Sequence, residues 1–150
     1  MKKFVFTLEA VAKYKQTVEK KQKADLSRVM YLLNTLYAEE KKLLAAIEEN
    51  AASLMRALSE NHDVLTEIKR HDIYQIFLRE RLEEIREKIS RAEAEKKRIQ
   101  ALLIITMKEL KTLTRLREEQ YRAYLEEVRR EEYTLIQDLI SHKTVAGQEE

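Results

Sequence analysis

The residues that could do chemistry in this chain are few and lie far apart. The chain has three histidines, one glycine and no cysteine. A zinc or di-iron site needs several ligands at close spacing, such as the Glu-x-x-His pairs of helical bundles, and no such pair occurs. A phosphate-binding loop needs several glycines, and Gly147 is the only one. We therefore expect no enzyme activity, catalytic residue, metal or cofactor. The histidines are His62, His71 and His142.

Adjacent carboxylates are the other candidates for acid–base chemistry. Several Glu-Glu pairs occur in segments that are rich in helix-forming residues and are interleaved with lysine and arginine. This pattern is typical of the solvated face of a helix, so we expect no acid–base role. The balance of 29 basic and 27 acidic residues also argues against a nucleic-acid-binding surface. The pairs include Glu39-Glu40, Glu48-Glu49, Glu83-Glu84 and Glu126-Glu127.

The composition predicts an all-α protein. The 150 residues include no proline and one glycine, and 37% of them are charged. Strands and tight turns are rarely built without Gly and Pro, whereas long helices and coiled coils use this mixture. We expect one coiled-coil domain over residues 1–150, built as an antiparallel hairpin of two long helices. No apolar run reaches the roughly 18 residues of a transmembrane helix.

Apolar residues at steps of three, four or seven predict a first helix over about 8–58. Residues 59–63 then break the pattern, and Asn61 or Asp63 is expected to cap a second helix. A chain folded back at this turn would place Val29 near residues 92–96. The stripe of the first helix is Val29, Leu33, Leu36, Leu43, Ile47, Leu54 and Leu58.

The second stripe alternates steps of four and three without exception, which is typical of a left-handed coiled coil. It predicts a second helix over about 64–142, followed by a frayed tail over 143–150. Lys96 and Thr106 are its polar members and are expected to fix the register of the helices. The stripe is Leu78, Leu82, Ile85, Ile89, Ala92, Lys96, Ile99, Leu103, Thr106, Leu110 and Leu113.

After Leu113 the stripe changes register. Two consecutive steps of four, to Arg117 and then to Tyr121, predict a stutter. The second helix is also the longer one, at roughly 120 Å against roughly 75 Å, so about its last 25 residues should lack an intramolecular partner. An apolar stripe without a partner indicates a surface for another protein. The restored stripe is Tyr121, Leu125, Val128, Leu135 and Leu139.

Two surfaces are therefore candidate binding sites for proteins. The first, called the aromatic patch, could instead broaden the core near the turn. The second, called the Tyr/Arg surface, combines the residue types favoured at interfaces, although that end of the helix could also fray or dimerise. The aromatic patch comprises Ile73, Tyr74, Phe77 and Arg81. The Tyr/Arg surface comprises Tyr121, Arg122, Tyr124, Leu125, Val128, Arg129 and Arg130.

Three segments, in this order, resemble the FliJ family of bacterial flagellar proteins. Residues 4–11, Phe-Val-Phe-Thr-Leu-Glu-Ala-Val, are similar to the family's opening F-x-F-x-L-E-x-V/L. Residues 74–78, Tyr-Gln-Ile-Phe-Leu, are similar to its Y-Q-x-F/Y-L/V run, and residues 116–124 to its L-R-E-K-x-x-x-x-Y/F run. The resemblance covers nearly the whole chain. It departs at residues 134–139, Thr-Leu-Ile-Gln-Asp-Leu, where the family often has Lys-Glu-x-Asp-Glu/Asp.

Membership of that family implies a non-catalytic central-stalk and adaptor component of the flagellar type III export apparatus. The implied partners are the hexameric export ATPase, the cytoplasmic domain of the export-gate membrane protein, and export chaperones. The protein would be cytoplasmic, peripherally associated with the inner-membrane apparatus, and would bind no nucleic acid. The aromatic patch would contact the gate, and the Tyr/Arg surface would contact the ATPase ring.

Other interpretations remain open at this stage. An injectisome component is a close relative of the flagellar one. A generic structural or chaperone-like coiled-coil scaffold that self-associates is an alternative of a different class. A curved membrane-binding rod is a third, and it would need a concave basic face.

Overall fold

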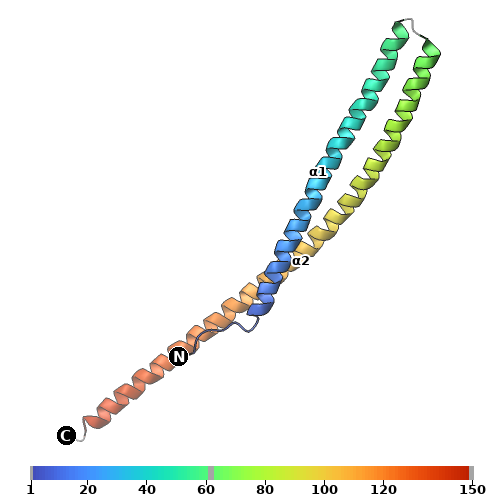
Figure 1. Cartoon of the computed structure of the whole chain (residues 1–150). Helices are drawn as coiled ribbons and strands as arrows, with labels where there is room; N and C mark the ends of the chain where they lie inside the picture. Colours follow the sequence, from blue (N-terminus) through green and yellow to red (C-terminus); the bar gives the residue numbers. More distant parts are fainter. Residues whose placement is uncertain (1, 61–62, 149–150) are drawn as a thin grey trace. The chain divides into compact units, whose positions relative to one another are not determined.

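The computed structural model describes residues 2–60 and 63–148 and consists of two long helices (Figure 1). α1 spans Glu9–Ser59 and α2 spans Val64–Ala146. The two helices pack against each other, which confirms the expected all-α hairpin with the longer helix second. Each bound of α1 lies one residue later than expected, and α2 continues to Ala146, through the first part of the expected tail.

The contacts divide the chain into two compact units, where one domain was expected. The hairpin unit is Lys21–Leu103, which holds the turn with the end of α1 and the start of α2. The terminal unit combines Met1–Lys20 with Ile104–Glu150. Each unit therefore holds a stretch of both helices.

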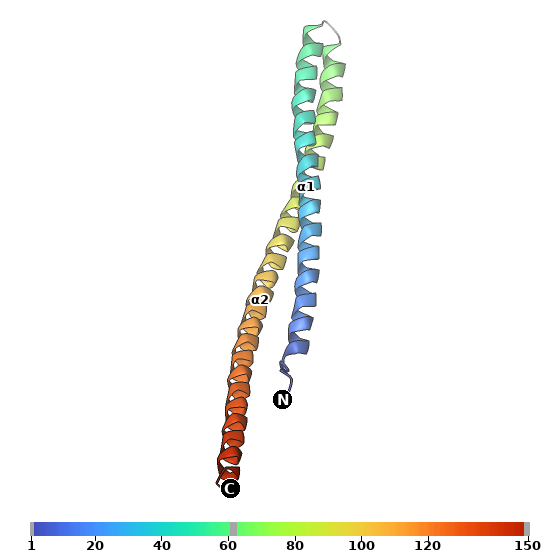
Figure 2. The ribbon, with the colours of Figure 1, turned by 90° about the vertical axis from the view of Figure 1, so that its left-hand side faces the viewer.

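In the hairpin unit the two helices lie side by side and run in opposite directions (Figures 1 and 2). Their seam is made by the apolar stripes, because steps of three and four return to the same face of a helix. Val29 packs against the cluster that contains Ala92, which confirms the expected register. The hydroxyl of Tyr37 donates to Glu93 Oε1 across the seam at 2.6 Å, and this bond raises the pKa of Tyr37 above its usual value. The buried cluster is Leu33, Leu36, Ile85 and Ala92.

Asp63 caps α2, as one of the two expected alternatives. Its carboxylate accepts a hydrogen bond from the hydroxyl of Thr66 at 2.7 Å, and its carbonyl accepts one from the amide of Glu67 at 3.1 Å. The Thr66 hydroxyl lowers the pKa of the Asp63 carboxyl because it stabilises the charged form. A negative charge here also interacts favourably with the helix dipole. The other expected cap, Asn61, lies outside the described residues.

In the terminal unit the packed face of α2 shifts its register, but at other residues than expected. Arg117 and Tyr121 were expected on the packed face, and both are exposed. Leu116, Gln120 and Tyr124 are half-buried instead. The expected stutter therefore falls on other residues: two steps of three lead from Leu110 to Leu116, and steps of four then lead through Gln120 and Tyr124 to Val128. Residues 2–6 have no regular structure, so they need not match a helical repeat.

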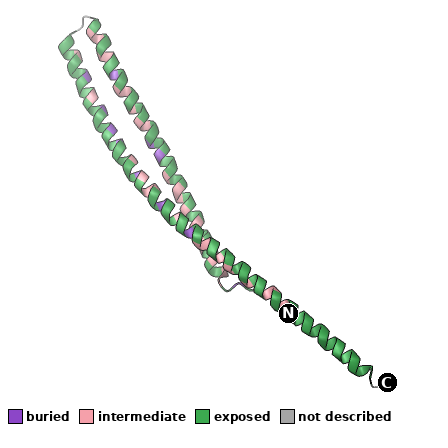
Figure 3. Cartoon of the chain, turned by 180° about the vertical axis from the view of Figure 1, so that it is seen from behind, coloured by how far each residue is buried: buried purple, intermediate pink, exposed green. Residues whose placement is uncertain are grey.

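The last part of α2 is exposed on all sides. Leu125 and Val128 are half-buried, but every described residue from Arg129 to Gln148 is exposed (Figure 3). The uncovered part of α2 therefore begins about ten residues later than the helix lengths suggested. The extra cover comes from the segment before α1.

Candidate protein-binding surfaces

The aromatic patch lies on the exposed side of α2, with Tyr74 at its edge beside Asn50 of α1. Ile73 is 71% exposed and Phe77 is 59% exposed, whereas the neighbouring core residue Leu78 is 3% exposed. Tyr74 stacks on Phe77 with ring centroids 6.4 Å apart and an interplanar angle of 20°. The interpretation that these residues broaden the core is therefore wrong. They form an exposed apolar surface within a charged helix.

Arg81 borders this patch and is available to a partner. Its guanidinium makes an ion pair with Glu84 Oε2 at 3.2 Å, one turn along the exposed face of α2. Exposed pairs of this kind contribute little stability because water and salt screen them. A carboxylate on a partner can therefore replace Glu84 at small cost. The patch offers an apolar contact with a cation beside it, which suits a partner surface that is apolar and locally acidic.

Within the Tyr/Arg surface, the two tyrosines contact the segment before α1, whereas the arginines are exposed. The ring of Phe4 lies 5.1 Å from the ring of Tyr121 and 5.6 Å from that of Tyr124. The hydroxyl of Tyr124 donates to the carbonyl of Lys2 at 2.8 Å. The expectation that these tyrosines lack an intramolecular partner was therefore wrong, because the segment before α1 reaches further than its length as a helix would allow. The three arginines of the surface are exposed: Arg122, Arg129 and Arg130.

Beyond this surface α2 carries large apolar side chains in water. Leu135 and Leu139 were expected on the stripe, and Ile136 and Ile140 join them at the neighbouring positions. Steps of one, three and four place all four on one side of the helix. Each is more than half exposed. The end of α2 thus presents an apolar face that nothing in the terminal unit covers, as far as its residues are described.

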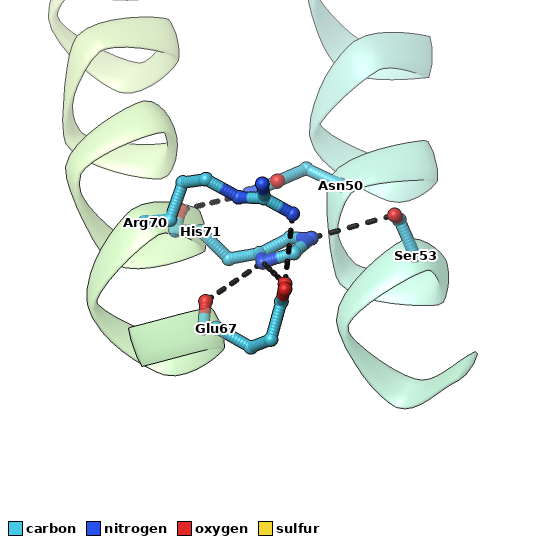
Figure 4. Close-up of polar contacts among 5 residues, drawn as sticks. All are labelled: Asn50, Ser53, Glu67, Arg70 and His71. Atoms are coloured by element: carbon cyan, nitrogen blue, oxygen red, sulfur yellow. Dashed lines mark hydrogen bonds and ion pairs between the residues drawn. The ribbon is translucent and has the colours of Figure 1, made fainter. Parts of the chain in front are cut away.

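A polar cluster inside the hairpin unit was missed by the sequence analysis (Figure 4). Asn50 and His71 are each only 8% exposed. The amide of Asn50 donates to the carbonyl of His71 at 3.1 Å and to Gln75 Oε1 at 2.9 Å. The signal was present in the spacing: steps of three and four backward from Leu78 reach Gln75 and His71. Asn50 likewise lies within the seven-residue step from Ile47 to Leu54.

His71 contacts a carboxylate and a hydroxyl, which are the groups that accompany histidine in a catalytic triad. Its Nδ1 lies 2.8 Å from the carbonyl of Glu67 and 3.6 Å from the Glu67 carboxylate, and its Nε2 lies 3.3 Å from Ser53 Oγ. This order resembles a nucleophile, a base and an acid. However, both helices use their backbone amides in helical hydrogen bonds here, and the guanidinium of Arg70 beside the cluster is paired with the Glu67 carboxylate at 2.8 Å. The cluster is better explained as a polar seam that fixes the register of the two helices.

The patch and the α2 residues of the cluster, His71 and Gln75, lie in one short segment of α2 with an inverted pattern. His71 and Gln75 face α1, while Ile73, Tyr74 and Phe77 face water. A helix selected only for stability would place apolar residues inside and polar residues outside. Departures from such local rules are expected mainly at functional sites.

Comparison of the chain with protein-family models, with curated proteins and with solved structures finds no match. Over the described ranges, no group of three or more potential ligands is placed to hold a metal ion. Neither α1 nor α2, where described, has a stretch long and apolar enough to cross a membrane. The observations that bear on function are therefore the helical fold, the aromatic patch and the uncovered end of α2.

The buried cluster makes a prediction about stability. Asn50→Ala should lower the free energy of unfolding by about 1–3 kcal/mol, because it removes both hydrogen bonds of Asn50 across the seam and leaves the amide oxygen of Gln75 without this donor. The exposed Asn34 on the same helix provides a matched control, and Asn34→Ala should change stability by less than about 0.5 kcal/mol. Urea unfolding followed by circular dichroism measures both. Equal effects would show that the cluster does not stabilise the seam.

Proposed function

We propose that this chain is a non-catalytic stalk and adaptor component of a flagellar type III export apparatus. In this role it binds the hexameric export ATPase, the cytoplasmic domain of the export gate, and export chaperones. The resemblance of its three motifs to the FliJ family suggests this role. The observation that supports the role most strongly is the uncovered end of α2. The chaperone contact and a cytoplasmic position at the inner-membrane apparatus rest on the resemblance alone.

The uncovered end of α2 suits a partner that surrounds a single helix. From Arg129 to Gln148 every described residue is exposed, and Leu135, Ile136, Leu139 and Ile140 form an apolar face. Burying such side chains stabilises a complex by roughly 1.5–3 kcal/mol each when exposure is fully lost. An isolated helix gains little from propensity, so a partner would also hold this segment helical. The central opening of a ring-shaped ATPase is a surface of that geometry.

Charges beside this face favour the same kind of partner. Arg129 and Arg130 stand exposed on α2, just before the apolar residues. Arginine binds carboxylates with two parallel hydrogen bonds, so it orients a helix as well as attracting it. We expect acidic groups on the ring opposite these two side chains.

The aromatic patch supports the gate contact. Exposed aromatic residues next to arginine are the composition of interface hot spots. The patch lies in the hairpin unit, whereas the uncovered helix end lies in the terminal unit, so the two surfaces use different residues throughout. An adaptor needs such separate surfaces because its partners must bind at the same time.

A self-associating scaffold is the second candidate function. The observation that favours it is the same apolar face, since two copies can bury Leu135 and Leu139 against each other. Sedimentation of the purified chain distinguishes the two candidates: the adaptor role predicts a monomer in the micromolar range, and the scaffold predicts a dimer.

The first prediction from the adaptor role concerns the ATPase. Leu139→Asp should weaken binding to the hexameric export ATPase at least about tenfold, because it places a charge in the apolar face that the ring would bury. Met55→Asp is the matched control, since Met55 is 70% exposed and Leu139 is 65% exposed. Met55 lies in the hairpin unit, and its substitution should leave binding unchanged. Surface plasmon resonance with the immobilised ring measures both variants.

Helical content should be unchanged in each variant, because both positions face water. If Leu139→Asp binds the ring as tightly as Met55→Asp, the apolar face of α2 is not the contact.

The second prediction concerns the gate. Phe77→Ala should weaken binding to the cytoplasmic domain of the export gate about 10- to 30-fold, as expected for an aromatic hot spot. It should change the free energy of unfolding by less than about 0.5 kcal/mol because the side chain is 59% exposed. Tyr31→Ala, at a residue 76% exposed on α1, is the control and should alter neither quantity. Calorimetry gives the affinity, and thermal unfolding gives the stability. Unchanged gate affinity in Phe77→Ala would remove the patch from the proposal.

A further inference from the structure

Residues 2–8, called the strap, lie against α2 through ring contacts and a hydrogen bond. Phe4 packs edge-on against Tyr121 and at a tilt against Tyr124, and the two tyrosine rings stack on each other 6.2 Å apart. Phe6 is buried, at 5% exposure. The carbonyl of Lys2 accepts the hydroxyl proton of Tyr124 in a hydrogen bond. The strap thus carries aromatic side chains at i and i+2, of which Phe4 contacts the two tyrosines of α2 and Phe6 is buried.

The strap joins α1 through a short turn, and the carbonyl of Leu8 accepts a hydrogen bond from the amide of Ala12 in α1 at 2.9 Å. Residues 2–6 form no regular structure, and the amide of Glu9 donates to the carbonyl of Phe6 at 3.2 Å where the helix begins. Side-chain contacts of this type are individually modest, and Phe4 and Tyr121 remain partly in water. Release of the strap would leave the long seam of the hairpin unit unchanged, since that seam uses other residues.

An open groove lies beside the strap. A groove of about 330 Å³ lies beside Phe4 and is bordered by Thr114, Arg117, Glu118 and Tyr121. It has room for a side chain larger than the Phe4 ring, with an arginine and a glutamate at its edge. A segment with a bulkier aromatic residue at this position would bury more apolar surface than the strap does.

We propose that the Tyr121–Tyr124 face of α2 is a binding site for an extended protein segment with aromatic residues at positions i and i+2. The strap is its resident occupant, and a partner segment of the same chemistry takes its place. This inference goes beyond the export role and does not need it, because the site and its occupant both belong to the terminal unit.

Competition by the tethered strap determines how the site behaves. A segment linked by a short turn has an effective concentration on the order of millimolar, so it blocks weaker free peptides. Weakening the strap therefore raises the apparent affinity of a free peptide without adding any contact. This is opposite to the usual effect of removing an aromatic side chain from a binding protein.

The experiment uses the full chain and a fluorescent peptide of residues 2–10. Fluorescence anisotropy should show that Phe4→Ala binds the peptide at least about tenfold more tightly than the unmodified chain, because its own strap competes less. A peptide with Trp at the Phe4 position should bind more tightly still, because it fills the groove. A peptide with Ala at both Phe positions should not bind.

The matched controls are tyrosine substitutions in the Phe4→Ala chain. Replacing both Tyr121 and Tyr124 by Ala should abolish peptide binding, whereas Tyr133→Ala should not affect it. Tyr133 is exposed on the same helix and its hydroxyl accepts a hydrogen bond from Gln137, outside the strap's contacts. If Phe4→Ala loses helical content, Phe4→Leu replaces it, since leucine keeps an apolar side chain but loses the ring contacts.

Three results would overturn the proposal: no peptide binding to the weakened-strap chain, equal binding to both chains, or binding that survives loss of both tyrosines. This experiment contains neither the ATPase nor the gate protein. Its failure would therefore not contradict the export role, which the two binding experiments above test separately.

Discussion

A helix can bury its apolar stripe only along the length that another segment covers. α1 has 51 residues and α2 has 83, so a hairpin cannot cover all of α2 with α1. The strap extends the cover to Tyr124, and Leu125 and Val128 are the last half-buried positions. Beyond Val128, α2 is a helix with an apolar face in water. The proposed roles of the chain depend on this unequal length, because it separates the packed part of the molecule from the part that can bind.

The sequence predicted most of the fold because coiled-coil packing follows a local rule. Steps of three and four located both helices to within a few residues, and the register placed Val29 beside Ala92. The rule could not predict the contacts of residues 2–6, because these residues are not helical. The strap has no repeat, so nothing in its spacing showed that Phe4 would reach Tyr121 and Tyr124.

The binding surfaces were predicted in part, for a related reason. Composition pointed to Tyr74 and Phe77 but left open whether they face the core, and only the exposed fractions decided this. Asn50 and His71 were missed because a polar residue interrupts an apolar stripe and looks like its end. This segment of α2 therefore buries the polar residue His71 and exposes the apolar residues Ile73 and Phe77. A register fixed by hydrogen bonds leaves the outer face available for contacts with other proteins.

Hydrogen exchange along α2, read by mass spectrometry, tests the central claim most directly. We predict rapid exchange for residues 129–146 in the isolated chain, because no neighbouring segment protects them, and slow exchange in the same residues when the export ATPase ring is added. Residues 78–99 should be protected in both states. Slow exchange of residues 129–146 in the isolated chain, or no change on adding the ring, would contradict the claim.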